Sequence, residues 1–270
     1  MQRSVSTRDP NQKSPMEKLL SVMDRLRDQE TGCEWDKEQT FSSIAPFTIE
    51  EAYEVADAIS RKNHNDLKLE LGDLLLQVVF LSQIAKEEGL FEFEDVANAI
   101  SNKLITRHPY VFENPKKHTS DEQLESWEDT KAKERKELNF ESLMDDIALT
   151  LPALMRSQKI QKRASRAGFD WSSLDGYFEK IQEELDELKM AITNNDHDNK
   201  EEEIGDLLMI LTNLSRHLKI DAETALSKSN RKFEKRFRYI EDELNKTGKN
   251  VNESSLEEMD KLWDEAKLIN

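Results

Sequence analysis

One arrangement of acidic residues occurs twice in this chain, and the two copies are 133 positions apart (184 minus 51, and 206 minus 73). The first copy consists of Glu50, Glu51, Glu54, Glu70 and Asp73, and the second of Glu183, Glu184, Glu187, Glu203 and Asp206. The same register pairs Gly72 with Gly205. Asp and Glu together account for 56 of 270 residues, so a lone acidic pair would mean little. Five acids and a glycine in one ungapped register indicate an internal duplication of a helical unit.

The composition favours helices in both units. Charged residues make up 35% of the chain and hydrophobic residues 36%, with only 7 Gly and 6 Pro. This balance is typical of long amphipathic helices joined by short turns, so we expect an all-α fold of two tandem helical bundles. The net charge of −17 repels nucleic acid and anionic membranes, so we expect neither as a partner. With no apolar run long enough to span a bilayer, a soluble cytoplasmic protein is expected.

The duplication also predicts the domain organisation. Residues 1–15 are polar and are expected to form a disordered tail. An N-terminal helical domain is predicted over 16–138, a linker over 139–150, and a C-terminal helical domain over 151–270.

Local signals predict where the helices that carry the acids begin. Pro46 is expected in the first turn of a helix that runs from Phe47. Asn199, with Glu202 three residues later, resembles a capping box for a helix from Lys200. His64 and His197 fall in the predicted turns between the paired helices.

The spacing of the acids predicts a metal site. Residues three apart on a helix share a face, so Glu184 pairs with Glu187 and Glu203 with Asp206. The short turn between the two helices makes them antiparallel, which lets the pairs face each other. Four carboxylates form an all-oxygen site that suits Mg²⁺, with Mn²⁺ as a substitute.

Two other interpretations of the acids are weaker. A solvated acidic face is the simpler interpretation of a single helix, but apolar residues flank the acids in both copies, and burial of an acid among them is costly without a cation. A di-iron carboxylate bundle needs Glu-x-x-His on two helices, whereas this chain has Glu-x-x-Asp.

A basic strip in the second copy predicts phosphate binding. Lys232 and Arg236 lie one turn apart on a predicted helix in an otherwise acidic chain. A surface stripe paired with nearby Glu residues is the alternative. Trp263, with Lys267 one turn later, could stack on a nucleobase or belong to the core.

Several motifs resemble one known family. They are the duplicated acids, Gly32-Cys33 with Trp35-Asp36 and Gln39-Thr40, the run Leu151-Pro-Ala-Leu-Met-Arg156, the run Gln158-Lys-Ile-Gln-Lys162, and Gly168-Phe-Asp-Trp171. Together they resemble the two-domain MazG-type nucleoside triphosphate pyrophosphohydrolases over almost the whole chain from about residue 16. Glu34 stands where many members have Pro, in a segment that is expected to be a loop outside the acidic site.

The resemblance implies an all-α homodimer that hydrolyses an NTP or dNTP to the monophosphate and pyrophosphate with Mg²⁺, as nucleotide-pool house-cleaning. It implies that Glu184, Glu187, Glu203 and Asp206 are the catalytic metal ligands. Residues expected to contact the nucleotide are Lys180, Glu183, Glu202, Lys232, Arg236, Trp263 and Lys267.

The two halves are not expected to be equally active. Glu51, Glu54, Glu70 and Asp73 form a second metal site, but Phe47 replaces Lys180 there, so the C-terminal half is predicted to be the main catalytic one. Two alternatives remain open from the residues. One is a non-catalytic module that binds metal or nucleotide to regulate a partner, and the other is a hydrolase of a different pyrophosphate-containing nucleotide, such as an alarmone.

Overall fold

The computed structural model describes residues 13–113, 119–137 and 140–269. Every regular element in these residues is a helix, and none is long and apolar enough to cross a membrane. The all-α prediction is therefore confirmed. Residues 1–12 of the predicted tail (1–15), residue 138 at the end of the predicted N-terminal domain and residue 139 at the start of the predicted linker (139–150) lie outside the described residues. The chain divides into two compact units, residues 1–132 and 133–270, and the division falls inside one helix.

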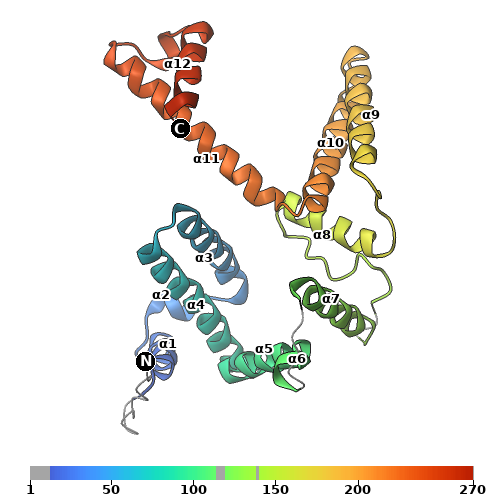
Figure 1. The fold of residues 1–270 in the computed structure, drawn as a ribbon. Helices are drawn as coiled ribbons and strands as arrows, with labels where there is room; N and C mark the ends of the chain where they lie inside the picture. Colours follow the sequence, from blue (N-terminus) through green and yellow to red (C-terminus); the bar gives the residue numbers. More distant parts are fainter. Residues whose placement is uncertain (1–12, 114–118, 138–139, 270) are drawn as a thin grey trace, which may run out of the picture. The chain divides into compact units, whose positions relative to one another are not determined.

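The first unit is built around a long helical hairpin (Figure 1). Its helices are α1 (Pro15–Leu26), α2 (Glu34–Glu38), α3 (Phe41–Arg61), α4 (His64–Glu87), α5 (Phe93–Arg107), α6 (Pro109–Phe112) and α7 (Ser120–Glu137), the last of which extends into the second unit. Helices α3 and α4 pack along each other, and α1 and α5 pack against α4. The core combines Met23 of α1, Ile44 of α3 and Phe80 of α4, all of which are buried. This hairpin carries the first copy of the acids.

The second unit repeats the hairpin. Its helices are α8 (Ala153–Arg166), α9 (Leu174–Thr193), α10 (His197–His217), α11 (Ala222–Lys246), the short 3₁₀ helix η1 (Val251–Glu253) and α12 (Leu256–Ile269). Helices α9 and α10 pack along each other, and α8 packs against α10 (Figure 1). Gln158 of α8 accepts a hydrogen bond from the Ala222 amide, which fixes the start of α11. Helix α11 in turn packs against α12.

The predicted start of the third helix is wrong. Helix α3 begins at Phe41, because Thr40 and Ser43 form a capping box and each side chain accepts from the other's backbone amide. Pro46 therefore lies inside the helix instead of in its first turn. Its missing N–H removes one backbone hydrogen bond, a loss that the cap and the buried Ile44 offset.

The predicted cap of α10 is also wrong, and so is the placement of both histidines in turns. Asp196, not Asn199, caps α10, because the Asp196 carboxylate accepts a hydrogen bond from the backbone N–H of Asn199 at 3.3 Å. Helix α10 consequently begins at His197, and α4 begins at His64. Neither histidine belongs to an acidic cluster in the described residues, so the argument against a di-iron site is unchanged.

Candidate metal centre and adjoining cavity

Carboxylates from α9 and α10 converge in the second unit. Glu184 and Glu187 of α9 and Glu203 of α10 each offer an oxygen, and the three oxygens lie within 4.8 Å of one another. Asp206 lies on the same helix as Glu203, one turn further on, and lines a cavity together with Glu184. The structure thus brings together three of the four predicted ligands and places the fourth beside them.

The buried acids in this cluster are partly compensated by one lysine. Glu184 and Glu203 are only 4% and 8% exposed. The Lys180 ammonium lies 2.7 Å from a Glu184 oxygen and 2.9 Å from a Glu183 oxygen. The hydrogen bond from Lys180 lowers the pKa of Glu184. Burial, reinforced by Glu184 and Glu187, raises the pKa of Glu203. One lysine facing several carboxylates leaves an excess of negative charge that favours a cation.

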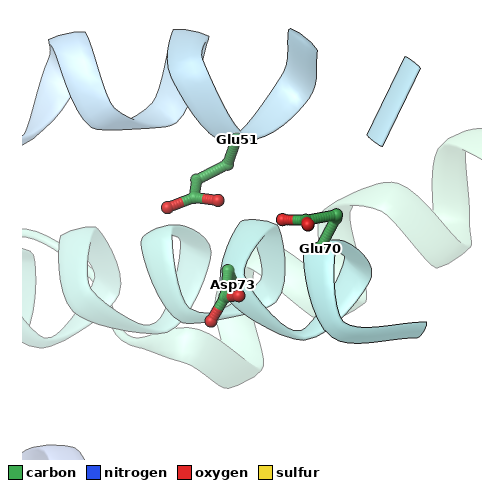
Figure 2. Close-up of side chains that lie close together, drawn as sticks. All are labelled: Glu51, Glu70 and Asp73. Carbon is green, nitrogen blue, oxygen red and sulfur yellow. The ribbon is translucent and has the colours of Figure 1, made fainter. Parts of the chain in front are cut away.

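The first unit holds a matching cluster. Figure 2 shows Glu51 of α3 pointing toward Glu70 and Asp73 of α4, and their oxygens also lie within 4.8 Å of one another. Burial and then the charge of Asp73 raise the pKa of Glu51. Burial and then Glu54 raise the pKa of Glu70, although Glu54 itself is outside the group. Phe47 stands at the position of Lys180 and lies edge-on to Trp35, with ring centroids 6.2 Å apart.

The donor atoms of both clusters fit a hard divalent cation. Each cluster consists of carboxylate oxygens from two facing helices, without sulfur or imidazole. Mg²⁺, Mn²⁺ and Ca²⁺ prefer such oxygen ligands, whereas zinc and copper sites normally include histidine or cysteine. Either cluster could therefore hold a metal ion.

A cavity of about 720 Å³ adjoins the acids of the second unit. Lys180, Glu184 and Asp206 contribute to its wall, as do apolar side chains of α8 and α10. The loop that precedes α9 contributes Phe169 and Trp171. A space of this size, mostly apolar and open to a cluster of charged groups, is typical of a small-molecule site.

A polar network holds the loop at the cavity. Asp170 accepts hydrogen bonds from Arg216 at 2.7 Å and from the Tyr177 hydroxyl at 2.7 Å. Although burial acts to raise the pKa of Asp170, these two hydrogen bonds outweigh it and the pKa is lowered. Burial and then Asp170 raise the pKa of Tyr177 to about 12. The Trp171 ring packs on Tyr177 at 4.8 Å between centroids, so the network sets the position of Trp171.

Four of the remaining predicted nucleotide contacts lie on helices α11 and α12. Lys232 and Arg236 are on α11, and the Arg236 guanidinium lies 5.4 Å from the centre of the Trp263 ring on α12. Lys267 pairs with Asp264 at 2.8 Å. None of these four lines the cavity. Glu202 is exposed on α10.

The sequence reasoning missed the residues that shape the cavity. Asp170, Trp171 and Gln161 appear in the sequence only as members of longer motifs, and Tyr177, Arg216 and Asn213 are not among the predicted site residues. A usable signal was present for two of them. Tyr177 and Arg216 are polar residues at positions that face into the hairpin, where a buried polar group needs a partner.

The comparisons with known proteins agree with this architecture. Residues 39–112 and 173–240 each match the MazG nucleotide pyrophosphohydrolase domain. The chain therefore belongs to the MazG nucleotide pyrophosphohydrolase family, in a form with two copies of the domain.

Full-length relatives support the assignment. The nucleoside triphosphate pyrophosphohydrolase of Escherichia coli (strain K12) is 50% identical over 256 residues, which cover 93% of this chain and 97% of the relative. The nucleoside triphosphate pyrophosphohydrolase/pyrophosphatase MazG of Thermotoga maritima is 46% identical over 251 residues, covering 93% and 95%. A crystal structure of a mazG-related protein from Thermotoga maritima matches 43% of this chain and 98% of its own, with 24% identity and a TM-score of 0.37.

Proposed function

We propose that this protein hydrolyses nucleoside triphosphates, ribo or deoxyribo, to the monophosphate and pyrophosphate in a Mg²⁺-dependent reaction. The observation that carries the proposal is the cluster of Glu184, Glu187 and Glu203 beside Lys180, opening onto a cavity of about 720 Å³. The names of the two full-length relatives support the same reaction.

The chain's own groups prepare the site for a polyphosphate. Glu184, Glu187 and Glu203, with Asp206 beside them, would hold the metal. A divalent cation bound there would supply neutralisation of the triphosphate oxygens and a lowered pKa for a coordinated water. Lys180 adds a fixed positive charge at the same place. In the proposed reaction a water oxygen bonds to the α-phosphorus and its proton passes to a carboxylate of the site or to solvent. The bond from that phosphorus to the bridging oxygen breaks, and pyrophosphate leaves with the electron pair.

We further propose that the working form is a homodimer. The hairpins leave large apolar side chains exposed, and on α9 and α10 these include Met190, Ile204, Leu208 and Leu211. Exposed apolar surface of this kind marks an interaction site. A second copy that covers this surface could bring its Lys232, Arg236 and Trp263 to the triphosphate, since these residues do not line the cavity of their own chain.

The two copies of the domain are proposed to differ in activity. Both have converging carboxylates, but they differ at one position. Lys180 in the second unit offers a positive charge to a phosphate, whereas the equivalent Phe47 in the first unit is neutral. The second copy is therefore proposed to carry most of the turnover. A role in clearing unwanted nucleotides from the cytoplasmic pool would suit this activity.

The proposal is tested by incubating the purified protein with a panel of NTPs and dNTPs in Mg²⁺ and separating the products by anion exchange. Monophosphate and pyrophosphate in equal amounts, lost on adding EDTA and restored by excess Mg²⁺, are expected. Binding of nucleotides without product would favour a regulatory module. Turnover confined to alarmones or dinucleotides would favour the other hydrolase.

A further inference from the structure

The cavity between α8, α9 and α10 contains a buried hydrogen-bond acceptor that has no partner among the described residues. Gln161 of α8 lines the cavity and is 7% exposed. Its Nε2 donates to the Ser157 hydroxyl at 2.8 Å and to the Met209 carbonyl at 2.9 Å, whereas its Oε1 is buried without a hydrogen bond. Because the Met209 carbonyl can only accept, the amide cannot be turned around, and the free atom is the oxygen.

The rest of the wall suits a flat aromatic ligand. Phe169 and Trp171 come from the loop before α9, and Ile160 and Met209 come from α8 and α10. Asn213 also lines the cavity, and since its Oδ1 already accepts from Arg216 at 2.8 Å, the group it can offer a ligand is the Nδ2 donor. An apolar and aromatic wall with one acceptor and one donor is the usual chemistry of a site for a heteroaromatic ring.

The position of the cavity connects it to the metal centre. Lys180, Glu184 and Asp206 belong to its wall, and Glu184 also belongs to the carboxylate cluster. A nucleotide whose phosphates lie at that cluster would therefore reach into the cavity with its sugar and base. In the first unit the corresponding aromatic residue, Trp35, is instead in contact with Phe47, which stands at the position of Lys180.

From these observations we propose that this cavity is the nucleobase pocket of the second unit, and that Gln161 Oε1 accepts a hydrogen bond from a ring or exocyclic N–H of the base. The proposal rests on the proposed function for the identity of the phosphate site. It assigns the choice of base to Gln161, Asn213 and the loop with Phe169 and Trp171, and not to Trp263.

Binding of mononucleotides tests the pocket independently of turnover. AMP, GMP, CMP and UMP, which the proposed reaction does not consume, would be titrated into the full-length protein in Mg²⁺ by calorimetry, and the tightest binder taken further. Ala164 of α8 lines the cavity, so Ala164→Leu fills part of it and is expected to weaken binding by roughly tenfold or more. Ala153→Leu makes the same change at an exposed position of the same helix outside the cavity, and is expected to leave the affinity within about twofold.

A change in the ligand tests the acceptor without altering the protein. The tightest binder is compared with purine riboside monophosphate or pyrimidin-2-one riboside monophosphate, whose bases carry no N–H. We expect the affinity for the analogue to be roughly tenfold lower, because the analogue cannot donate a hydrogen bond to the buried acceptor. Thermal unfolding of Ala164→Leu and Ala153→Leu confirms that each variant is folded.

The outcomes separate this proposal from the proposed function. Three results would overturn the pocket. They are equal affinity of Ala164→Leu and Ala153→Leu for the tightest-binding mononucleotide, equal affinity of the wild type for that mononucleotide and for its analogue without N–H, and no mononucleotide binding at all. If hydrolysis of triphosphates persists in any of those cases, the proposed function stands without it. If binding depends on the pocket but no triphosphate is hydrolysed in Mg²⁺, the pocket stands and the proposed function falls.

Discussion

The ammonium of Lys180 lies 2.7 Å from the carboxylate of Glu184, one turn along the same helix. Glu184 is buried, so this contact keeps an acid ionised where burial alone would favour its neutral form. The same contact places a fixed cation next to the carboxylates that are proposed to hold a metal. In the first unit the equivalent residue is Phe47, which makes this pair the clearest chemical difference between the two copies.

Replacing Lys180 should reduce activity without unfolding the protein. Lys180→Gln removes a charge-assisted hydrogen bond to Glu184, and we expect kcat/KM for the best triphosphate to fall by roughly tenfold to a hundredfold. The matched control is Lys189→Gln, since Lys189 pairs with Asp186 at 2.7 Å on the same helix but is exposed. It should leave kcat/KM unchanged. Equal effects of the two substitutions would remove Lys180 from the site.

The duplication itself provides a matched pair of substitutions. Glu203→Gln and Glu70→Gln make the same change at equivalent positions of the two clusters. We expect Glu203→Gln to lower kcat by roughly a hundredfold or more, and Glu70→Gln to keep most of the activity, since loss of one group that stabilises transition-state charge typically costs that much. Steady-state kinetics in saturating Mg²⁺ measure both. The reverse pattern would assign catalysis to the first unit.

The Asp170 network should make stability depend on pH at its acidic end. The folded-state pKa of Asp170 is lowered, so its contribution is fully present above the unfolded value of about 3.9 and is lost as the pH falls through the folded-state value. Asp170→Asn should therefore lower the free energy of unfolding by about 2 kcal/mol at pH 7, because Arg216 and Tyr177 lose an ionised partner. The difference should shrink as the pH falls below 3.9.

Urea unfolding of the wild type and of Asp170→Asn across this range measures the effect. The control is Asp186→Asn, whose carboxylate pairs with Lys189 at an exposed position. It should change stability little at any pH. A difference for Asp170→Asn that stays constant down to the lowest pH would show that the charge of Asp170 is not what stabilises the loop.

Two helical glycines should respond in opposite ways to alanine. A Cβ on Gly176 would lie 2.3 Å from Cδ1 of Trp171, whereas one on Gly205 would meet nothing within 4 Å in the described part of the chain. We expect Gly176→Ala to displace the Trp171 ring and to destabilise the fold by about 1–3 kcal/mol. Gly205→Ala should stabilise the isolated fold by about 1 kcal/mol through its helix propensity.

Near-ultraviolet circular dichroism and urea unfolding distinguish the two glycine variants. A changed aromatic signal is expected only for Gly176→Ala. An unchanged spectrum and stability for Gly176→Ala would mean that Trp171 does not rest against the start of α9. Destabilisation by Gly205→Ala would instead indicate that another copy of the chain packs against that face of α10.

The sequence predicted the helical hairpins and the convergence of their acids, because both depend on local periodicity and on a short turn. It misplaced the starts of α3 and α10, where Thr40 and Asp196 provide stronger caps than the proline and asparagine that were considered. The cavity was not predictable in this way. It depends on Arg216 reaching Asp170, a contact across 46 positions that no local pattern encodes.

The nucleotide contacts on α11 and α12 were expected from the basic strip of Lys232 and Arg236 and from the resemblance. The structure places Arg236 over the Trp263 ring and leaves both outside the cavity wall. Their part in binding stays a prediction, and it depends on the proposed second copy. By contrast, Lys180 was predicted from the same resemblance and lies in contact with Glu184 within one chain.

The central claim is attack of water at the α-phosphorus of a nucleoside triphosphate, and isotope labelling tests it most directly. The reaction is run in Mg²⁺ and water enriched in oxygen-18, and the products are analysed by mass spectrometry. The account predicts one labelled oxygen in the nucleoside monophosphate and none in the pyrophosphate. Label in the pyrophosphate would place the attack at the β-phosphorus, and nucleoside diphosphate with labelled orthophosphate would place it at the γ-phosphorus. Either result would contradict the account.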